Sequence, residues 1–291
     1  MREVFPTYDI SPYPVGGAAG TKEFIAGNLE MVFSSTPDLR FLYARQEWYK
    51  DVPEEALKTV HMLHLMYAHN ILVTTPEVQR KYGINSWKDL HGKKVALFSV
   101  KMTPHLLFKM NLKVVGVDVT HVEMDFETMP DALKKGDIVA CVAPITGGTP
   151  PPWVLSLTTK VKVVVLNPSA DELKVLEKEG VDVGWFSSAK FKEYGIDVLG
   201  LDKIFGVIQV LGWHSHPKFL SEDDVYRLLK ELIRRKDELV KMSKYFAEFA
   251  EDPIGMQVKA ISLVPQVPVH PGLAKLLKEY GVWKESWKVA S

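Results

Sequence analysis

Short apolar segments alternate with amphipathic segments along most of the chain, and this alternation limits what the chain can fold into. The expected strands, each an apolar run of strand length, are Leu29–Ser34, Thr59–Leu72, Lys94–Ser99, Val119–Glu123, Ile138–Ala143, Lys160–Leu166 and Val207–His214. The expected helices between them, each with helical spacing of apolar residues, are Thr21–Ala26, Thr103–Val114, Thr128–Lys134 and Ser169–Glu177. Alternation of this kind favours an α/β architecture with largely parallel sheets.

Two stronger helices are expected toward the carboxyl end. Ser221 suits the N-cap of the first, because three acidic residues follow it in the first turn. Its apolar stripe consists of Val225, Leu228, Leu229, Leu232 and Ile233. The second helix spans Lys236–Glu251, with Pro253 soon after it. The mixed charges of this region are more typical of a solvated helix surface than of a binding site.

The segment Pro268–Gly281 predicts a capped terminal helix. Pro271 suits the first helical turn, where its missing N–H is not needed, and Gly281 suits the stop. A lone histidine on such a segment is more often structural than functional, so we expect His270 to be buried and hydrogen-bonded.

Composition narrows the function classes. The 291 residues are enough for two domains, and 46% of them are hydrophobic. The 36 basic and 36 acidic residues cancel, which argues against nucleic acid as the main partner. No apolar run reaches the roughly 18–20 residues of a membrane helix. Abundant Lys and Glu with scarce Asn and Gln form a bias reported for hyperthermophiles, so we expect a thermophilic protein.

Several familiar chemistries find no support in the sequence. Cys141, the one cysteine, lies in the apolar run Ile138–Ala143, so we expect a buried thiol rather than a nucleophile. The pairs His61/His64 and His214/His216 lack neighbouring Cys or acidic ligands, so no metal is predicted. The chain has no G-x-S-x-G elbow, no P-loop and no dinucleotide fingerprint. We therefore predict neither a cofactor nor an enzyme.

Two places are typical of domain crossings. Gly83–Val95 is a Gly- and Asn-punctuated stretch before a new strand, and Leu201–Val210 passes from a polar loop into a strand. The expected domains are therefore one lobe of residues 1–93 plus 206–291 and a second lobe of residues 94–205.

Four motifs, in order along the chain, resemble the solute receptors of TRAP transporters, of the TAXI type. The first is Gly16–Thr21 with Ala26–Ser35, and the second is Ser86–Val95. The third is Ala132–Ala140 with Gly147–Pro150. The last, Pro268–Ala274, is similar to the family's P-L-H-P-G-A string.

The resemblance implies a two-lobed, type II periplasmic-binding-protein-like fold with mostly parallel sheets and a ligand cleft between the lobes. It implies that closure of the lobes captures a small organic anion, such as glutamate or another carboxylate. The partners would then be the solute and the membrane permease subunits of a TRAP transporter, outside the cytoplasm. A diverged cytoplasmic sensor or partner-binding protein is the alternative, and an enzyme on this fold is a third reading.

Three features depart from the family pattern, and one of them is Val139, which stands where the family's I-D-A run has its acidic residue. The family's first strand and G-T-G-S-type loop have no counterpart, and the amino terminus lacks the apolar stretch of a signal peptide. Either Met1 is the true start and the protein is cytoplasmic, or the natural chain is longer. The family's G-S-G-T loop is replaced by Val100–Pro104, where Thr103 and Pro104 still suit an N-cap and first helical residue.

Three loops are the candidate ligand site. Ser34, Ser35 and Thr36 offer hydroxyls after a strand, and a plain N-cap cluster is the competing interpretation. Lys101 and Thr103 precede a helix, where Lys101 would replace lost backbone donors by a charge. The glycine turn after another strand, with an aromatic residue that could pack on a ligand or on the core, adds Gly147, Gly148, Thr149 and Trp153.

Overall fold

The computed structural model describes residues 9–15 and 17–291. The expected absence of a signal peptide at the amino terminus, and the first glycine of the Gly16–Thr21 motif, lie outside this part of the chain. The chain divides into two compact units. Unit 1 consists of residues up to Tyr67 together with Gln209–Ser291, and unit 2 consists of Ala68–Ile208.

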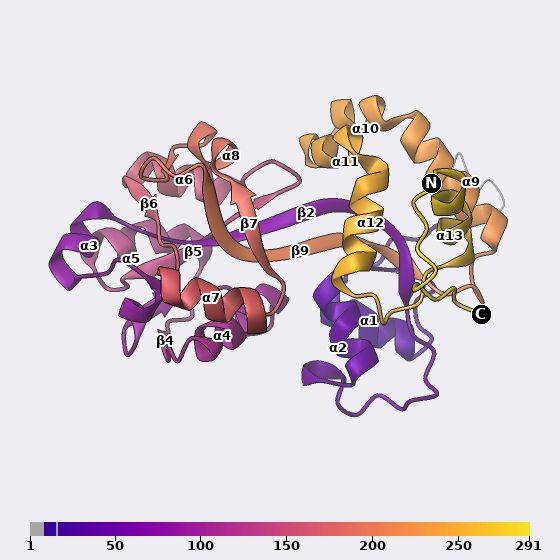
Figure 1. Ribbon diagram of the computed structural model, residues 1–291, viewed down its shortest axis with the longest axis horizontal. Coiled ribbons are helices and arrows are strands. Elements are labelled where there is room, and N and C mark those ends of the chain that lie inside the picture. The colour runs from indigo at the N-terminus through magenta and orange to yellow at the C-terminus, as the bar shows by residue number, and fades with distance from the viewer. Residues whose placement is uncertain (1–8, 16) are drawn as a thin grey trace. The chain divides into compact units, whose positions relative to one another are not determined.

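The chain passes from unit to unit inside two long strands, β2 (Val60–Thr74) and β9 (Lys203–Ser215). These strands are neighbours in the sheet (Figure 1). The second crossing therefore falls three residues after the expected boundary at 205/206. The first falls at 67/68 rather than 93/94, because Gly83–Val95, which contains a short 3-10 helix and the start of a strand, lies wholly within unit 2, and the crossing has no turn signal of its own.

Unit 1 surrounds one half of these strands with helices. Its strand β1 (Val32–Ser35) pairs antiparallel with β9. The other elements of unit 1 are α1 (Gly17–Ile25), α2 (Thr36–Ala44), η1 (Glu47–Tyr49), α9 (Glu222–Arg234), α10 (Lys236–Met242), η4 (Lys244–Phe246), α11 (Ala247–Glu251), α12 (Pro253–Leu263) and α13 (Pro271–Glu279).

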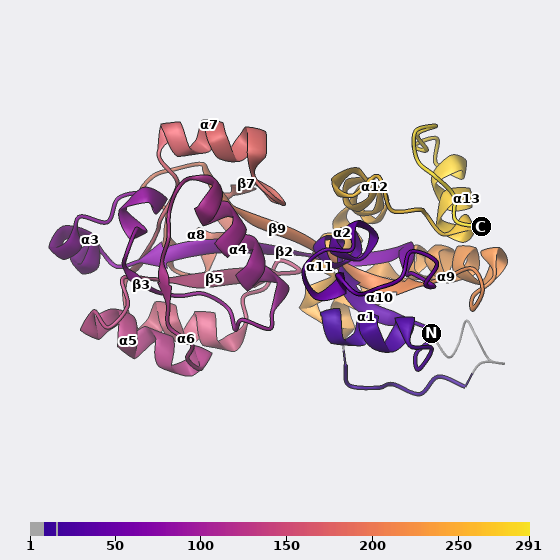
Figure 2. The same ribbon diagram turned by 90° about the horizontal axis from the view of Figure 1, so that it is seen from below.

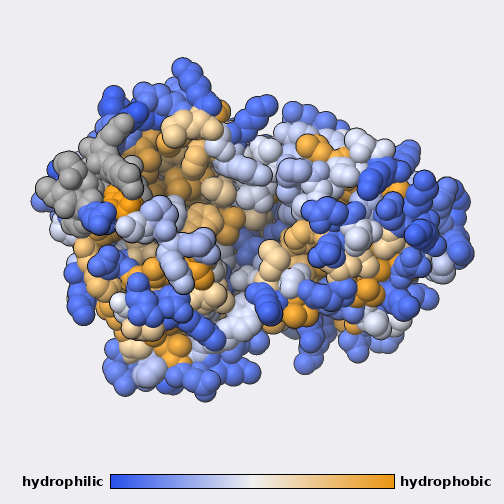
Figure 3. Space-filling model, turned by 180° about the vertical axis from the view of Figure 1, so that it is seen from behind, coloured by the Kyte–Doolittle hydropathy of each residue, from blue (hydrophilic) through white to orange (hydrophobic). Residues whose placement is uncertain are grey.

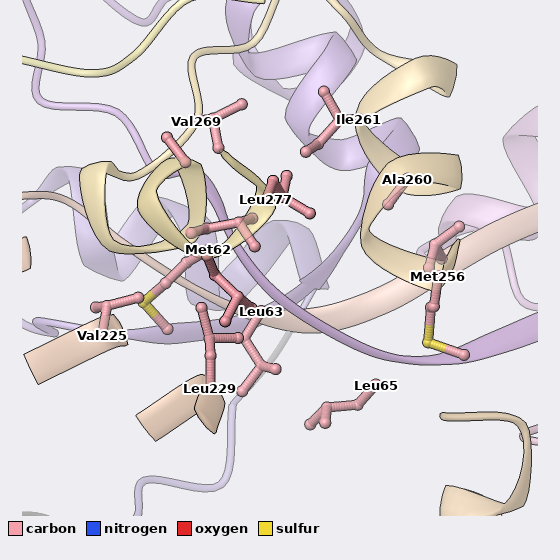
Figure 4. Close-up of a cluster of buried hydrophobic side chains, with 14 of the residues drawn as sticks. Met62, Leu63, Leu65, Val225, Leu229, Met256, Ala260, Ile261, Val269 and Leu277 are labelled. Atoms are coloured by element: carbon pink, nitrogen blue, oxygen red, sulfur yellow. The ribbon is translucent and has the colours of Figure 1, made fainter. Parts of the chain in front are cut away.

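Apolar side chains from β2, α9, α12 and α13 form the main core of unit 1. Figure 4 shows Met62 and Leu63 of β2 near Val225 and Leu229 of α9, with Leu277 of α13 close by. All of these side chains are buried. The apolar stripe expected on α9 therefore faces this core. Helices α9 and α13 contribute buried side chains to the same core as β2.

The terminal helix α13 begins as the sequence predicts. Pro271 is its first residue, and His270 is the N-cap, whose Nδ1 accepts the Gly272 N–H at 3.2 Å. The other ring nitrogen donates to Leu220 O at 3.0 Å, and the side chain is fully buried. The structural interpretation of His270 is therefore confirmed. Gly281 follows the helix with a positive φ of 69°.

Unit 2 carries two pairs of packed helices on its strands. Its strands, besides parts of β2 and β9, are β3 (Lys94–Ala96), β4 (Thr120–His121), β5 (Ala140–Thr146), β6 (Val163–Val165), β7 (Val183–Ser187) and β8 (Ile196–Asp197). Its helices are α3 (Pro76–Tyr82), η2 (Trp87–Leu90), α4 (Thr103–Val114), η3 (Phe126–Thr128), α5 (Met129–Lys135), α6 (Pro152–Lys160), α7 (Ala170–Glu179) and α8 (Ser188–Glu193). Helix α4 packs on α7, and α5 packs on α6, with α7 on one side of β3 and β5 and α5 and α6 on the other (Figure 2).

The α/β class is confirmed, but the sheet is mixed rather than largely parallel. Strand β3 pairs parallel with β4 and β5, and β6 pairs parallel with β8. Strand β2 pairs antiparallel with β5 and β6, and β9 pairs antiparallel with β1 and β7. A helical crossover enforces parallel pairing only between the strands that it joins. β2 and β5 are separated by two other strands in sequence, so the alternation does not set their relative direction.

The expected helix Lys236–Glu251 is divided into α10, η4 and α11. Ser243 is extended, with φ −158° and ψ 129°, and its hydroxyl accepts the Tyr245 N–H. Such local side-chain bonding lets serine end a helix. In contrast, α4 has the bounds that the sequence predicts.

On the face of the molecule drawn in Figure 3, the outer edge is mainly hydrophilic. Figure 3 shows hydrophilic side chains over most of the outer edge of the face in view, with hydrophobic ones gathered in smaller areas. Among the described residues, no helix is both long and apolar enough to cross a membrane.

Candidate functional site

The three parallel strands β4, β3 and β5 of unit 2 direct their carboxyl ends to one edge of the sheet. Val95 of β3 pairs with His121 of β4 on one side and with Ala140 of β5 on the other. In open α/β sheets, ligands bind outside the carboxyl ends of such strands. The segments at this edge, called the carboxyl-edge loops below, are residues 97–103, 122–126 and 147–153, which include the first residues of α4, η3 and α6.

The first carboxyl-edge loop leads into α4. Met102 is the N-cap, with Thr103 and Pro104 as the first helical residues, so the N-cap lies one residue earlier than the expected Thr103. Met102 has no side-chain acceptor, and α4 has no side-chain cap. The Thr103 side chain is buried, whereas Lys101 is exposed at the loop. The structure thus brings Lys101 to the surface at this edge.

The glycines after β5 form a tight turn. Gly147 and Gly148 have φ values of 57° and 78°, and Thr146 and Thr149 exchange two backbone hydrogen bonds of 2.9 and 3.0 Å. Two successive positive φ values in a two-residue turn define type I′, which favours glycine at both positions. The Tyr194 hydroxyl donates to Gly148 O at 3.3 Å. The turn geometry therefore accounts for both glycines, and ligand contact there stays a prediction.

Aromatic rings connect the three carboxyl-edge loops. The Trp153 ring stacks on the Phe126 ring, with 4.7 Å between centroids and an interplanar angle of 7°. Phe126 also contacts Phe98 edge to face at 6.0 Å. Trp153 and Phe126 are half-buried, while Phe98 is buried. Trp153 therefore packs on a neighbouring loop and keeps part of its surface at the edge.

A carboxylate that sequence reasoning missed lies among these loops. Glu123 Oε2 accepts the Val100 N–H at 3.3 Å and lies 2.9 Å from His121 Nε2. His121 Nδ1 accepts the Leu97 N–H at 3.3 Å, so Nε2 carries the ring proton and donates to Glu123. A hydrogen bond from Ser99, and then the one from His121, lower the pKa of Glu123 to about 2.

Glu123 is ionised at neutral pH and half-exposed, with 53% of its side chain accessible. The sequence places it at the end of the expected strand Val119–Glu123. That position at a carboxyl end is the signal that could have identified it.

Ser34, Ser35 and Thr36 lie in unit 1, where β1 passes into α2, and all three are buried. Ser35 occupies the N-cap position, but its hydroxyl donates to Asp38 Oδ2 at 2.7 Å instead of capping a backbone group. Thr36 Oγ1 accepts the Val210 N–H at 3.2 Å, and Thr21 Oγ1 lies 3.4 Å from Ser34 Oγ. Each hydroxyl has a partner within unit 1, and ligand contact by them stays a prediction.

Of the histidines in the pairs His61/His64 and His214/His216, three come together in the structure. His61 Nδ1 lies 3.0 Å from His64 Nε2, and the His64 ring contacts the His214 ring with 5.0 Å between centroids. All three are fully buried, and burial lowers their pKa, to about 4 for His61 and about 3 for His214. His216 lies outside this trio and is half-buried.

The trio lacks an acidic or thiolate ligand, and the described residues contain no group of three or more potential ligands able to hold a metal ion. Cys141 is buried, and burial raises its thiol pKa to about 12.

Comparison with known proteins gives a family match. The model of the NMT1-like family matches residues 32–281. A search of the curated proteins finds no match. The aliphatic sulphonate binding protein SsuA from Escherichia coli is 12% identical, with a TM-score of 0.42 over 99% of this chain and 88% of that one. A Streptococcus pneumoniae ABC uptake transporter substrate-binding protein with bound histidine is 14% identical, with a TM-score of 0.43 over 84% and 80%. A putative L-cystine ABC transporter protein from Listeria monocytogenes is 16% identical, with a TM-score of 0.41 over 84% and 81%. Likeness at this level does not indicate what this chain binds.

Proposed function

Since the chain belongs to the NMT1-like family, we propose that it is a solute-binding receptor that captures a small molecule and delivers it to a membrane transporter. The observation that carries this proposal is the family match over residues 32–281, which includes all the predicted site loops. The role needs reversible binding and no covalent step.

The carboxyl-edge loops of unit 2 support binding at that edge. They combine an exposed Lys101, a fixed carboxylate at Glu123 and the half-buried ring of Trp153. A few polar groups beside aromatic surface are typical of small-molecule sites. We include Lys101, Thr103, Gly147, Gly148, Thr149 and Trp153 in the proposed site, together with Glu123.

Finer features of the proposal come from the sequence resemblance alone. They are a carboxylate-bearing solute, TRAP-type permease subunits as partners, closure of two lobes on the solute, and a location outside the cytoplasm. In unit 1, the hydroxyls of Ser34, Ser35 and Thr36 belong to this finer proposal. Their ligand role requires that the internal hydrogen bonds of Ser35 and Thr36 exchange for bonds to the solute.

The test is a thermal-shift screen of the purified chain against amino acids, dicarboxylates, aliphatic sulphonates and amines. A bound solute stabilises the folded state in proportion to the logarithm of its concentration above the Kd. We expect the melting temperature to rise with concentration for one chemical class and to stay constant for the others. A melting temperature that no member of the panel changes would remove the support for a solute receptor.

A further inference from the structure

The loop before α4 is where an anion would be expected to bind, and one of its donors is already used. A ligand carboxylate at this position would need backbone N–H groups near a helix N-terminus. The Val100 N–H instead donates to Glu123 Oε2 at 3.3 Å. A carboxylate of the protein itself thus takes a donor that a bound anion would need.

The position of Glu123 is fixed from two sides. Val100 holds it from the first carboxyl-edge loop, and His121 holds it from β4 through a 2.9 Å contact at Nε2. His121 is itself fixed by the Leu97 N–H at its other ring nitrogen, with 16% of its side chain accessible. A carboxylate held in this way loses little side-chain entropy when it binds a further group, which favours a specific site.

The exposed part of Glu123 can only accept hydrogen bonds. An ionised carboxylate has about four lone-pair directions, and the contacts at Glu123 use part of them. The Phe98, Phe126 and Trp153 rings lie on the same three loops. The face of an aromatic ring attracts a cation electrostatically, and a carboxylate does so too. Both features favour a positively charged or N–H-bearing group at this edge.

We infer that Glu123 is a ligand-binding residue that accepts a cationic or N–H group of the solute, so that this edge of unit 2 selects solutes bearing an amine. The inference rests on the proposed receptor function and narrows its substrate class. The resemblance predicts a carboxylate on the solute, and an amine on the same molecule is an additional requirement. Lys101, exposed on the neighbouring loop, remains the cation for a carboxylate.

The experiment compares matched solutes that differ only in the amine. Glutamate is paired with glutarate and phenylalanine with 3-phenylpropionate, each titrated calorimetrically into the wild-type chain. A site built to pair with a donor rejects an analogue that lacks it, so we expect the amine of a bound pair to improve affinity by about tenfold or more. Glu123→Gln keeps the shape and removes the charge, and it should abolish most of this preference.

Glu127→Gln is the matched control, because Glu127 is an exposed carboxylate on η3 four residues away. It should bind like the wild type, and both variants should melt within a few degrees of it. Equal or tighter binding of the amine-free members, or an unchanged preference in Glu123→Gln, overturns the inference and leaves the receptor function standing. Binding of no solute by the wild type overturns the receptor function, and the inference with it.

Discussion

At the scale of single residues, the histidines in the core of unit 1 are the most unusual side chains of the chain. His61, His64 and His214 are fully buried and contact one another. His61 Nε2 lies 3.1 Å from Val264 O, and His214 Nδ1 lies 3.2 Å from Val60 O, so these nitrogens carry the ring protons. Burial disfavours the charged form, so all three are neutral in the folded protein.

This neutrality predicts a loss of stability in acid. The unfolded histidines bind protons below pH 6.5, whereas in the folded protein burial lowers the pKa of His61 to about 4, that of His214 to about 3, and that of His64 well below 6.5. Stability is therefore fully present above pH 6.5 and falls as the pH falls toward 4. From pH 7 to 5.5 we expect the free energy of unfolding to fall by about 2–3 kcal/mol for His61 and His214, and protonation of His64 acts in the same direction. Urea unfolding at the two pH values measures it, and an unchanged or rising value would contradict the neutral trio.

The thiol of Cys141 gives a second prediction at this scale. It is fully buried in β5, and the elevated pKa keeps it protonated at neutral pH. Since the thiolate is the reactive form, a thiol reagent at pH 8 should leave the native protein unmodified. One equivalent should react once the protein is unfolded in guanidinium chloride, as mass spectrometry would show. Rapid modification of the native chain would mean that the strand opens readily or that the thiol is accessible.

At the scale of elements, the start of α13 packs closely on α9. A Cβ at Gly272 would overlap Glu222 O and would lie 2.7 Å from Tyr226 N, both backbone atoms of α9. Gly272→Ala should therefore lower the free energy of unfolding by about 1–3 kcal/mol, the usual cost of overpacking. Gly184→Ala on β7 is the control, because a Cβ there meets nothing within 4 Å. Chemical denaturation compares them, and equal stability of the two variants would show that α13 can shift away from α9.

Elements with their own start signals could be predicted from the sequence, and those set by distant contacts could not. Helix α4 has the expected bounds because Pro104 and a regular apolar spacing define it locally. Strand β7 was missed because its segment is short and contains Gly184, and it depends on pairing with β9. The candidate site shows the same difference between residues with a local sequence signal and residues whose role depends on distant contacts. Trp153 could be proposed as a site residue because it closely follows the Gly147–Pro150 motif, whereas the contacts of Glu123 depend on Val100 and His121, which only folding brings to it.

At the scale of the whole molecule, we propose that the protein is a receptor that binds one small solute through the carboxyl-edge loops of unit 2. The half-buried Trp153 ring is the largest side chain at that edge among the predicted site residues, and it stacks on Phe126. Removal of this ring should weaken binding without removing any backbone hydrogen bond. The loss of an aromatic contact of this kind costs about 1.5–3 kcal/mol, or roughly ten- to a hundredfold in Kd.

The most direct measurement is isothermal titration calorimetry with the solute that raises the melting temperature most, using the wild type, Trp153→Ala and Leu155→Ala. Leu155 lies two residues further along α6 and is 41% exposed, so its variant controls for changes to the helix surface. We predict one solute per chain, a Kd raised at least about tenfold by Trp153→Ala, and little change in Leu155→Ala. Binding that is equally tight in all three proteins would contradict the account, because the solute would then bind elsewhere.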